Sequence, residues 1–112
     1  MNVKKKGSAG ERELARRLCE YGYPSHRNNQ AYVGGKDNPD VTLAGMHVEC
    51  KRTERLALYD ALEQAHRDAN GHALPCVMHR KNNSQWVVIM YLDDWIQIYR
   101  EWEAGRISKW KN

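Results

Sequence analysis

The chain has 112 residues, of which 41% are hydrophobic and 29% charged, which suits one small globular domain and excludes a disordered chain. No apolar run reaches the length of a membrane span, and no hydrophobic signal segment follows the basic N-terminus. We therefore expect a cytoplasmic protein with no membrane partner. The formal net charge of +4 favours polyanionic partners without selecting among them.

The three cysteines do not indicate a disulfide framework, because their number is odd and their spacing irregular. Cys19, Cys50 and Cys76 each fall at an apolar-patterned position, which predicts buried free thiols. A zinc site is an alternative that no Cys-x-x-Cys pair supports, and its ligands would be His66, His72, Cys76 and His79.

The first predicted element is a helix that begins at Ser8. The segment Ser8-Ala-Gly-Glu11 has the form of a capping box, and the helix should continue to Tyr21 and end at Gly22. A basic arm precedes it over residues 1–6, which we expect to be mobile. The inward stripe of the helix also includes Glu11, and its apolar members are Leu14, Ala15, Leu18 and Cys19.

The segment 25–38 predicts an edge strand over residues 26–32, followed by a loop that contains Gly34-Gly35. No helix follows this loop, so a phosphate-binding P-loop is not the right comparison. The loop is either a flexible connector or a segment that folds over nucleic acid, with Arg27 and Lys36 touching phosphates.

Residues 38–51 predict a β-hairpin with one buried face. Apolar and polar residues alternate on both sides of the turn Ala44-Gly45, as in two short paired strands. Counting outward from the turn gives the pairs Leu43–Met46, Thr42–His47, Val41–Val48 and Asp40–Glu49.

A second helix is predicted over about residues 56–69, ending at Asn70-Gly71. Its apolar stripe consists of Leu58, Leu62, Ala65 and Ala69. Two strands should follow over 74–79 and 86–91. The second of these is almost entirely apolar, which predicts a central strand covered on both faces.

Asp93 or Asp94 should cap a final helix. Its inner stripe is predicted to be Trp95, Ile98, Tyr99 and Trp102, so core packing accounts for these tryptophans and for Trp86. The whole order of helices and strands predicts a single α/β domain over residues 1–112, with a mixed sheet flanked by helices.

Two carboxylates oppose each other in the predicted hairpin. Side chains at such positions have Cβ atoms about 4.5–5.5 Å apart, so Asp40 and Glu49 repel each other unless a cation lies between them. Lys51 is two residues beyond Glu49 and therefore on the same face of the strand. Oxygen ligands beside a lysine suit a divalent metal ion that binds water or phosphate. The alternative is an ordinary exposed hairpin with a polar outer face.

In this chain, eight residues separate Pro39-Asp40 from Glu49-Cys50-Lys51. This arrangement resembles the signature of the PD-(D/E)XK nuclease superfamily. The resemblance implies a restriction-endonuclease-like domain in which Asp40, Glu49 and the Cys50 carbonyl bind Mg²⁺, for which Mn²⁺ would substitute. Lys51 would position the attacking water. Similar enzymes commonly have a glutamate on the first helix, so Glu11 is either a further metal ligand or only a helix cap. Gln64, on the second helix, could also reach the site.

Within the superfamily, the chain is most similar to small Holliday junction resolvases of archaeal and phage type. The matching positions are Lys6-Gly7, Glu11-Arg12, Gly22-Tyr23, Arg27, Gly34-Gly35, Pro39-Asp40, Glu49-x-Lys51 and Gln64. The resemblance implies paired nicks in branched DNA, in a bacterial or phage-infected cell. Two coordinated cuts require two sites related by two-fold symmetry, which a homodimer supplies. Contacts with the DNA backbone are expected from Lys4, Lys5, Lys6, Arg12, Arg27, Lys36 and Arg52.

Two other classes of function stay open. A nicking, flap or restriction-type nuclease would share the same residues, although the chain contains no visible insert for reading bases in a major groove. A catalytically silent DNA-binding protein could use the same scaffold, but it would have no need for a self-repelling carboxylate pair. Metal-dependent cleavage distinguishes the silent protein from the nucleases, and substrate shape distinguishes the nucleases from one another.

Overall fold

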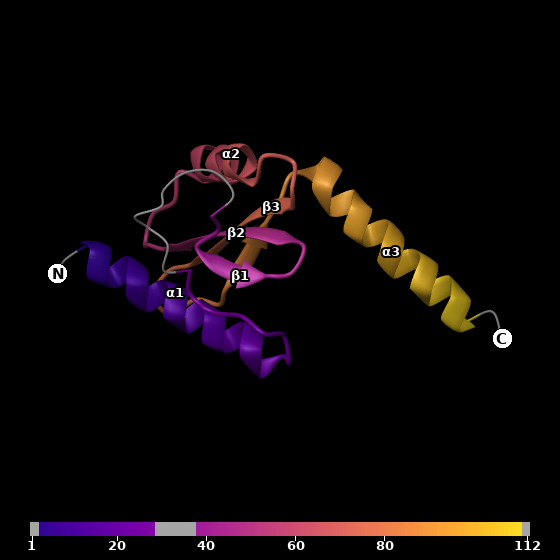
Figure 1. Ribbon diagram of the computed structural model, residues 1–112, viewed down its shortest axis with the longest axis horizontal. Helices are drawn as coiled ribbons and strands as arrows, with labels where there is room; N and C mark the ends of the chain where they lie inside the picture. Colours follow the sequence, from indigo (N-terminus) through magenta and orange to yellow (C-terminus); the bar gives the residue numbers. More distant parts are fainter. Residues whose placement is uncertain (1–2, 29–37, 111–112) are drawn as a thin grey trace.

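The computed structural model describes residues 3–28 and 38–110, with side chains for 7–28 and 38–106, and has the predicted α/β arrangement (Figure 1). The elements in chain order are α1 (Val3–Glu20), β1 (Val41–Leu43), β2 (Met46–Arg52), α2 (Leu58–Ala69), β3 (Leu74–Arg80), β4 (Val87–Ile89) and α3 (Leu92–Trp110). No helix in the described residues is long and apolar enough to cross a membrane.

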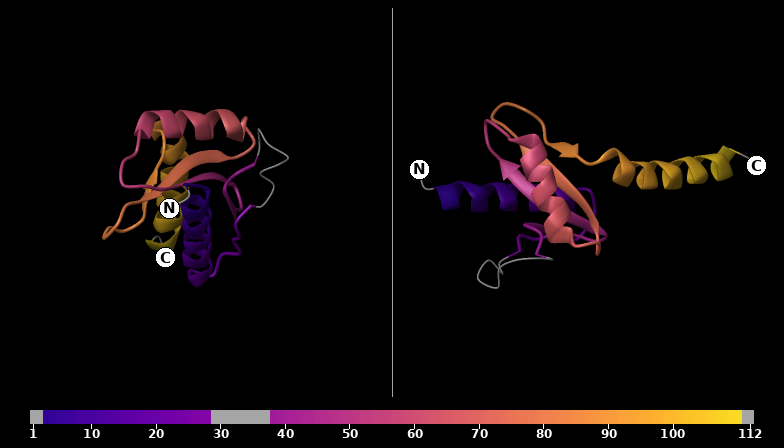
Figure 2. Two further views of the ribbon diagram at one scale, coloured as in Figure 1. Left: turned by 90° about the vertical axis from the view of Figure 1, so that its left-hand side faces the viewer. Right: turned by 90° about the horizontal axis from the view of Figure 1, so that it is seen from above.

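The four strands form one mixed sheet in the order β1-β2-β3-β4. β1 and β2 pair antiparallel in the predicted register, which comprises Val41–Val48, Thr42–His47 and Leu43–Met46. β2 and β3 are parallel, and α2 makes the crossover that a parallel pair requires. β4 runs antiparallel to β3. Figure 2 shows α1 and α2 on opposite sides of this sheet.

β2 is buried on both faces, so the prediction of one buried face is wrong. Val48 packs with Leu14 of α1 on one side and is fully buried. On the other side, His47 and Glu49 are only 2% and 4% exposed. The reason is that β2 pairs with β1 on one edge and with β3 on the other, so that a helix can cover each of its faces. The glutamate of the metal-binding signature therefore lies inside the protein.

The start of α1 differs from the prediction. The helix begins at Val3, so residues 3–6 are helical rather than a mobile arm, and Ser8 is not an N-cap. Lysine is a good helix former and extends the helix toward the N-terminus. The Ser8 Oγ instead accepts a hydrogen bond of 3.0 Å from Arg27 Nη2. Glu11 therefore cannot act as the partner in a capping box.

The C-terminal end of α1 is as predicted. Gly22 has a φ of +94°, which favours glycine, and its N–H donates to the Cys19 carbonyl, while the Tyr23 N–H donates to the Leu18 carbonyl. This pair of hydrogen bonds is a Schellman motif. Cys19 itself is exposed, contrary to the prediction, because the last turn of α1 leaves it on the solvent side.

The predicted edge strand is present in part. Residues 26–28 lie beside β1, where Arg27 forms an isolated bridge with Val41. The Asn28 N–H also donates to the Asp40 carbonyl at 2.9 Å. The rest of the predicted strand and the loop with Gly34-Gly35 and Lys36 lie outside the described residues.

α2 begins two residues later than predicted and ends as predicted, with Asn70 and Gly71 at positive φ. Leu62, Ala65 and Ala69 are buried against the sheet, as expected. The first member of the stripe, Leu58, is exposed instead, because it lies in the first turn of the helix.

The C-terminal third departs most from the prediction. β4 is a three-residue edge strand, not a central one, and Val87 and Val88 are 48% and 58% exposed. α3 extends away from the sheet and makes no extensive contact with the other described elements (Figure 1). The radius of gyration of the molecule is 15.2 Å, whereas a compact domain of this length has a value of about 13 Å. The molecule is thus more extended than a compact domain.

The predicted inner stripe of α3 is therefore uncovered. Its side chains Trp95, Ile98, Tyr99 and Trp102 are 37–54% exposed. α3 begins at Leu92, with Asp93 and Asp94 inside its first turn instead of capping it. An apolar stripe predicts that a helix face will be covered, but it does not say which surface covers it. Trp86 alone among these tryptophans is packed against the core, beside α1.

Candidate active site

Asp40 lies just before β1, and its side chain is hydrogen-bonded to the backbone of β2. Its Oδ2 accepts a hydrogen bond of 2.9 Å from the Cys50 N–H, and its own N–H donates to the Val48 carbonyl. Regular pairing stops at Val41–Val48, so the expected Asp40–Glu49 pair is not part of the ladder. The two carboxyl groups nevertheless interact: after burial, the charge of Glu49 is the largest of the effects that raise the pKa of Asp40.

The Asp40 carboxyl has an abnormally high proton affinity. Its pKa is raised from 3.8 to about 7, mainly by burial and further by the negative charges of Glu49 and Glu11. The hydrogen bond from Cys50 N–H lowers the pKa but does not compensate for these effects. A half-buried pair of acids that cannot easily carry two negative charges is an arrangement that a divalent cation stabilises.

Glu11 lies next to this pair and is held by Arg27. The Arg27 Nε donates to Glu11 Oε1 at 2.6 Å, and the side chains are only 28% and 18% exposed. Arg27 also donates to Ser8, so this residue connects α1 to the edge of the sheet. Arg27 is thus part of the support of the candidate site, and a contact with DNA phosphate would be in addition to that interaction.

Lys51 and Gln64, the other two predicted site residues, lie on β2 and α2. Lys51 follows Glu49 on the same face of β2, near the strand's C-terminal end, and is half-buried. Gln64 is half-buried on α2, one helical turn before Asp68. α2 runs antiparallel to β2, so Gln64 lies nearer than Asp68 to the end of the strand that contains Lys51.

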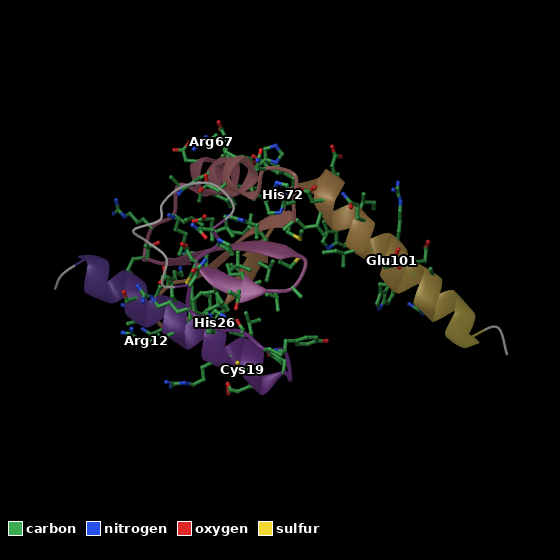
Figure 3. All side chains as sticks on the ribbon, viewed as in Figure 1. Arg12, Cys19, His26, Arg67, His72 and Glu101 are labelled. Carbon is green, nitrogen blue, oxygen red and sulfur yellow. The ribbon has the colours of Figure 1, made fainter. Side chains whose placement is uncertain are left out.

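The basic residues predicted to contact DNA differ in their exposure to solvent. Arg12 is exposed on the outer side of α1 (Figure 3). The backbone of Lys4, Lys5 and Lys6 lies in the first turns of the same helix, and their side chains are outside the described part, as is Lys36. Arg52 is instead largely buried, with 15% of its side chain exposed.

Arg52 belongs to a polar network centred on Glu13, a residue that the sequence analysis did not identify. Glu13 accepts hydrogen bonds from Arg80 and from the Trp86 indole, and lies 3.9 Å from the Arg52 Nε. Arg52 also donates to Asn82 at 2.9 Å. The network fixes α1 against the β3–β4 turn. The charged residues of segment 12–17 do not indicate this network, because the residues that form it are far apart in the sequence.

A second group missed by the sequence analysis is formed by His47, Glu49 and Asp68. One ligand atom from each lies within 4.8 Å of the others, and His47 and Glu49 are buried. The alternation of His47, Glu49 and Lys51 along β2 indicated a shared face, but the approach of Asp68 required knowledge of the tertiary structure. The alternative zinc set of His66, His72, Cys76 and His79 does not come together within the described part of the chain.

The cysteines contribute no reactive thiol near the site. Burial raises the pKa of Cys76 to about 12 and that of Cys50 well above its usual value, with the Asp40 charge adding to the effect at Cys50. Such thiols stay protonated and are poor nucleophiles. Only the carbonyl of Cys50 is thus a candidate for the chemistry, as the resemblance implied.

The model of a family described as "Phage putative PDDEXK endonuclease" matches residues 2–110. The chain belongs to this family. The PD-(D/E)XK resemblance is thereby confirmed, and the protein is a nuclease of a class that uses divalent metal ions.

Among solved structures, the chain is similar to Archaeoglobus fulgidus Hjc, a Holliday junction resolvase from an archaeal hyperthermophile. The TM-score is 0.56 and the sequence identity 23%, over 71% of this chain and 72% of that chain. At this identity, the similarity establishes a shared fold. No curated protein matches the chain.

The residues present fit a bound divalent cation. Asp40 and Glu49 supply the oxygen ligands that such ions prefer, and the pKa of Asp40 is raised by burial and by the charge of Glu49, both of which a cation would offset. Glu11 adds a third carboxylate within electrostatic reach. An all-oxygen donor set of this kind suits a hard divalent cation and not a thiolate-bound metal.

Proposed function

We propose that the protein is a Mg²⁺-dependent, structure-specific DNA endonuclease that resolves four-way DNA junctions as a homodimer. The observation that carries this proposal is the half-buried Asp40 carboxyl, with a pKa of about 7, beside the buried Glu49. A fold does not maintain two repelling acids in its interior without a use for them. Lys51 on the same strand face completes the set of groups needed for phosphodiester hydrolysis.

Asp40, Glu49 and the Cys50 carbonyl would hold Mg²⁺, with Glu11 as a further ligand. Bound there, the ion would acidify a water molecule and neutralise charge on the phosphate. The Cys50 N–H keeps Asp40 oriented through its hydrogen bond to Oδ2. Lys51 orients the attacking water and offsets the negative charge that develops on the phosphate. Gln64 contributes an amide from α2 on the same side of the sheet.

DNA binding would use the basic side of α1. The backbone of Lys4, Lys5 and Lys6 lies in its first turns and the exposed Arg12 follows two turns on, so basic residues are concentrated in the N-terminal part of the helix. Such residues contact phosphates and fix the orientation of the duplex without reading bases. Binding should therefore respond to the shape of the junction and weaken steeply as salt concentration rises.

The homodimer is supported by the surface of the C-terminal third. Trp95 and Trp102 are 44% and 54% exposed on α3, and Val87 and Val88 of β4 are exposed as well. Large apolar side chains that lie together in solvent mark an interaction surface. A second copy is the occupant that the chemistry favours, since paired cuts need two active sites related by two-fold symmetry.

Cleavage of defined DNA substrates tests the proposal. Purified protein with Mg²⁺ is incubated with an end-labelled immobile four-way junction and, in parallel, with matched linear duplex, flap and single-stranded DNA. Asp40→Asn keeps the oxygen that accepts the Cys50 hydrogen bond but removes the charge, so it is the matched inactive variant. Exposed Asp60→Asn, on α2, is the control for a carboxylate change away from the site.

Paired, symmetric nicks on the junction that disappear in Asp40→Asn and remain in Asp60→Asn would support the whole proposal. Cleavage of flap or duplex with the junction left intact would keep the metal-dependent nuclease and overturn the resolvase. Junction binding without cleavage in Mg²⁺ or Mn²⁺, equal in wild type and Asp40→Asn, would overturn the assignment of Asp40 and Glu49 to catalysis.

A further inference from the structure

His47, Glu49 and Asp68 form a cluster on the α2 side of β2. His47 and Glu49 are two residues apart and share that face of the strand, and Asp68 reaches them from the last turns of α2. The His47 Nε2 is 3.5 Å from the Glu49 Oε1, and one ligand atom from each of the three residues lies within 4.8 Å of the others. The cluster thus has the dimensions of a coordination sphere.

The His47 imidazole provides a second, independent indication. Its side chain is only 3% exposed, and its Nε2 has no hydrogen-bond partner in the described structure. Buried polar atoms nearly always have a partner, because an unsatisfied one costs about 1–3 kcal/mol. The Glu49 Oε1 lies 3.5 Å from this atom without forming a hydrogen bond with it, which is the situation of a ligand that lacks its cation.

We propose that His47, Glu49 and Asp68 bind a divalent cation of the Zn²⁺ or Mn²⁺ type, at a second metal site that shares Glu49 with the catalytic pair. One imidazole nitrogen and two carboxylates are a donor set that these ions accept, whereas Mg²⁺ prefers oxygen ligands alone. The two negative charges of Glu49 and Asp68 balance the charge of one dication. The fourth position is left for water.

This site goes beyond the proposed function and is distinct from the catalytic pair. Asp40 is not a member of the cluster, so within the described residues Glu49 is the sole carboxylate common to both sets. A cation held by His47 and Asp68 would fix the orientation of the Glu49 carboxylate and add positive charge behind the active site. It would also lower the cost of placing two acids inside the sheet.

The test measures Zn²⁺ and Mn²⁺ binding to the metal-free full chain by isothermal titration calorimetry. Asp40→Asn is the parent protein, because it removes the catalytic pair while leaving the cluster intact. Asp68→Asn is then added to this parent, and Asp60→Asn, an exposed change on the same helix, is added as the matched control. Circular dichroism of each variant confirms that it is folded.

We expect the parent to bind one Zn²⁺ per chain more tightly than Mg²⁺. Asp68→Asn should weaken Zn²⁺ binding by about tenfold or more, since it removes one of three ligands, and Asp60→Asn should leave it unchanged. His47→Gln is a second ligand variant and should weaken Zn²⁺ binding in the same way. Equal Zn²⁺ affinity in the parent and in Asp68→Asn would overturn the proposal, as would the absence of Zn²⁺ binding by the parent.

The outcome is separable from that of the proposed function. Loss of cleavage in Asp40→Asn together with retained Zn²⁺ binding would support both ideas. Retained cleavage in Asp40→Asn would overturn the proposed catalytic pair, while the Zn²⁺ titrations of Asp68→Asn would still decide the second site. Loss of Zn²⁺ binding in Asp40→Asn alone would place the cation at the catalytic pair and overturn the second site.

Discussion

The sheet and the C-terminal helix place their unusual residues in opposite environments. In β2, the charged Glu49 and the polar His47 are buried, whereas in α3 the aromatic Trp95 and Trp102 are exposed. A buried polar residue and an exposed apolar patch are both informative, because each departs from what folding alone favours. The first lies at the candidate active site, and the second is the surface that we propose for the contact with a second chain.

The two regions also differ in how they are held. α1, α2 and the first three strands pack around two adjoining sets of buried side chains, which include Leu14 and Val48 on one face and Leu62 and Val77 on the other. α3 has no such packing among the described elements. We expect the sheet with α1 and α2 to be stable by itself, whereas the fixed position of α3 depends on what covers its aromatic face.

The largest effect should come from Asp40→Asn, which changes the buried site and leaves the C-terminal region intact. Cleavage should fall by about 1,000-fold or more, because the cation loses a charged ligand. The metal-free protein should at the same time become more stable near neutral pH, since repulsion from Glu49 and Glu11 is removed. Cleavage rates and urea unfolding in EDTA measure the two effects. A variant that is both inactive and less stable would show that Asp40 is a structural residue.

The pH dependence of stability should be the next largest effect. The Asp40 carboxyl titrates at 3.8 in the unfolded chain and at about 7 in the folded one. Between these values the folded protein holds a proton that the unfolded chain has released. The free energy of unfolding of the metal-free protein should therefore fall as pH rises from about 4 to about 7, by a few kcal/mol.

Urea unfolding in EDTA at about pH 5 and about pH 8 measures this slope. Asp40→Asn is the control and should flatten it, while Asp60→Asn should retain it. Added Mg²⁺ should stabilise the wild type more at the higher pH, because it binds the deprotonated carboxylates. The same slope in the wild type and in Asp40→Asn would contradict the assignment of the raised pKa to Asp40.

Sequence patterns predicted the sheet well because its elements depend on local periodicity. The alternation around Ala44-Gly45 was sufficient to give the register of β1 and β2. The motif with Asp40, Glu49 and Lys51 predicted the family, which the family model confirms. The capping prediction at Ser8 failed because a tertiary contact with Arg27 replaces the local one. His47 and Asp68 were missed for the same reason: they are brought together by the packing of α2 on β2, which no spacing in the sequence records.

Patterns were least informative in the C-terminal third. The apolar run over 86–91 and the stripe from Trp95 to Trp102 both predicted burial, and both segments have exposed apolar side chains. An apolar stripe predicts that one face of a helix or strand will be shielded from water, but a partner chain can shield it as well as the core of the same chain can. The prediction of helix and strand was therefore correct here, and the prediction of what covers them was wrong.

The double variant Trp95→Ser/Trp102→Ser should change assembly without changing the sheet. We expect the dimer dissociation constant to rise by about 100-fold, since aromatic side chains dominate such interfaces. The unfolding midpoint of the monomer should stay constant, because both side chains are about half exposed on a helix that makes no extensive contact with the other described elements. Sedimentation velocity over a range of concentrations measures the association. Tyr59→Ser, an exposed aromatic change on α2, is the matched control. Unchanged association in the double variant would exclude α3 as the dimer surface.

The smallest effects come from two glycine substitutions that should have opposite signs in the two regions. In Gly10→Ala, the new Cβ on α1 would lie 2.5 Å from the Cβ of Arg52. The strand and the helix would have to separate, which should destabilise the protein by about 2 kcal/mol. In Gly105→Ala, no atom lies within 4 Å of the new Cβ on α3. Alanine there should favour the helix by about 0.5–1 kcal/mol.

The two substitutions also differ in where their effect is detected. Gly10→Ala should lower the unfolding midpoint of the whole domain, because α1 is packed on β2. Gly105→Ala should increase the protection of α3 amides against hydrogen exchange and leave that midpoint unchanged, because α3 unfolds locally. Gly7→Ala, with open space around it on α1, separates the close contact at Gly10 from any general effect of alanine in that helix. A midpoint raised by Gly105→Ala would mean that α3 unfolds together with the sheet, and the distinction between the two regions would then fail.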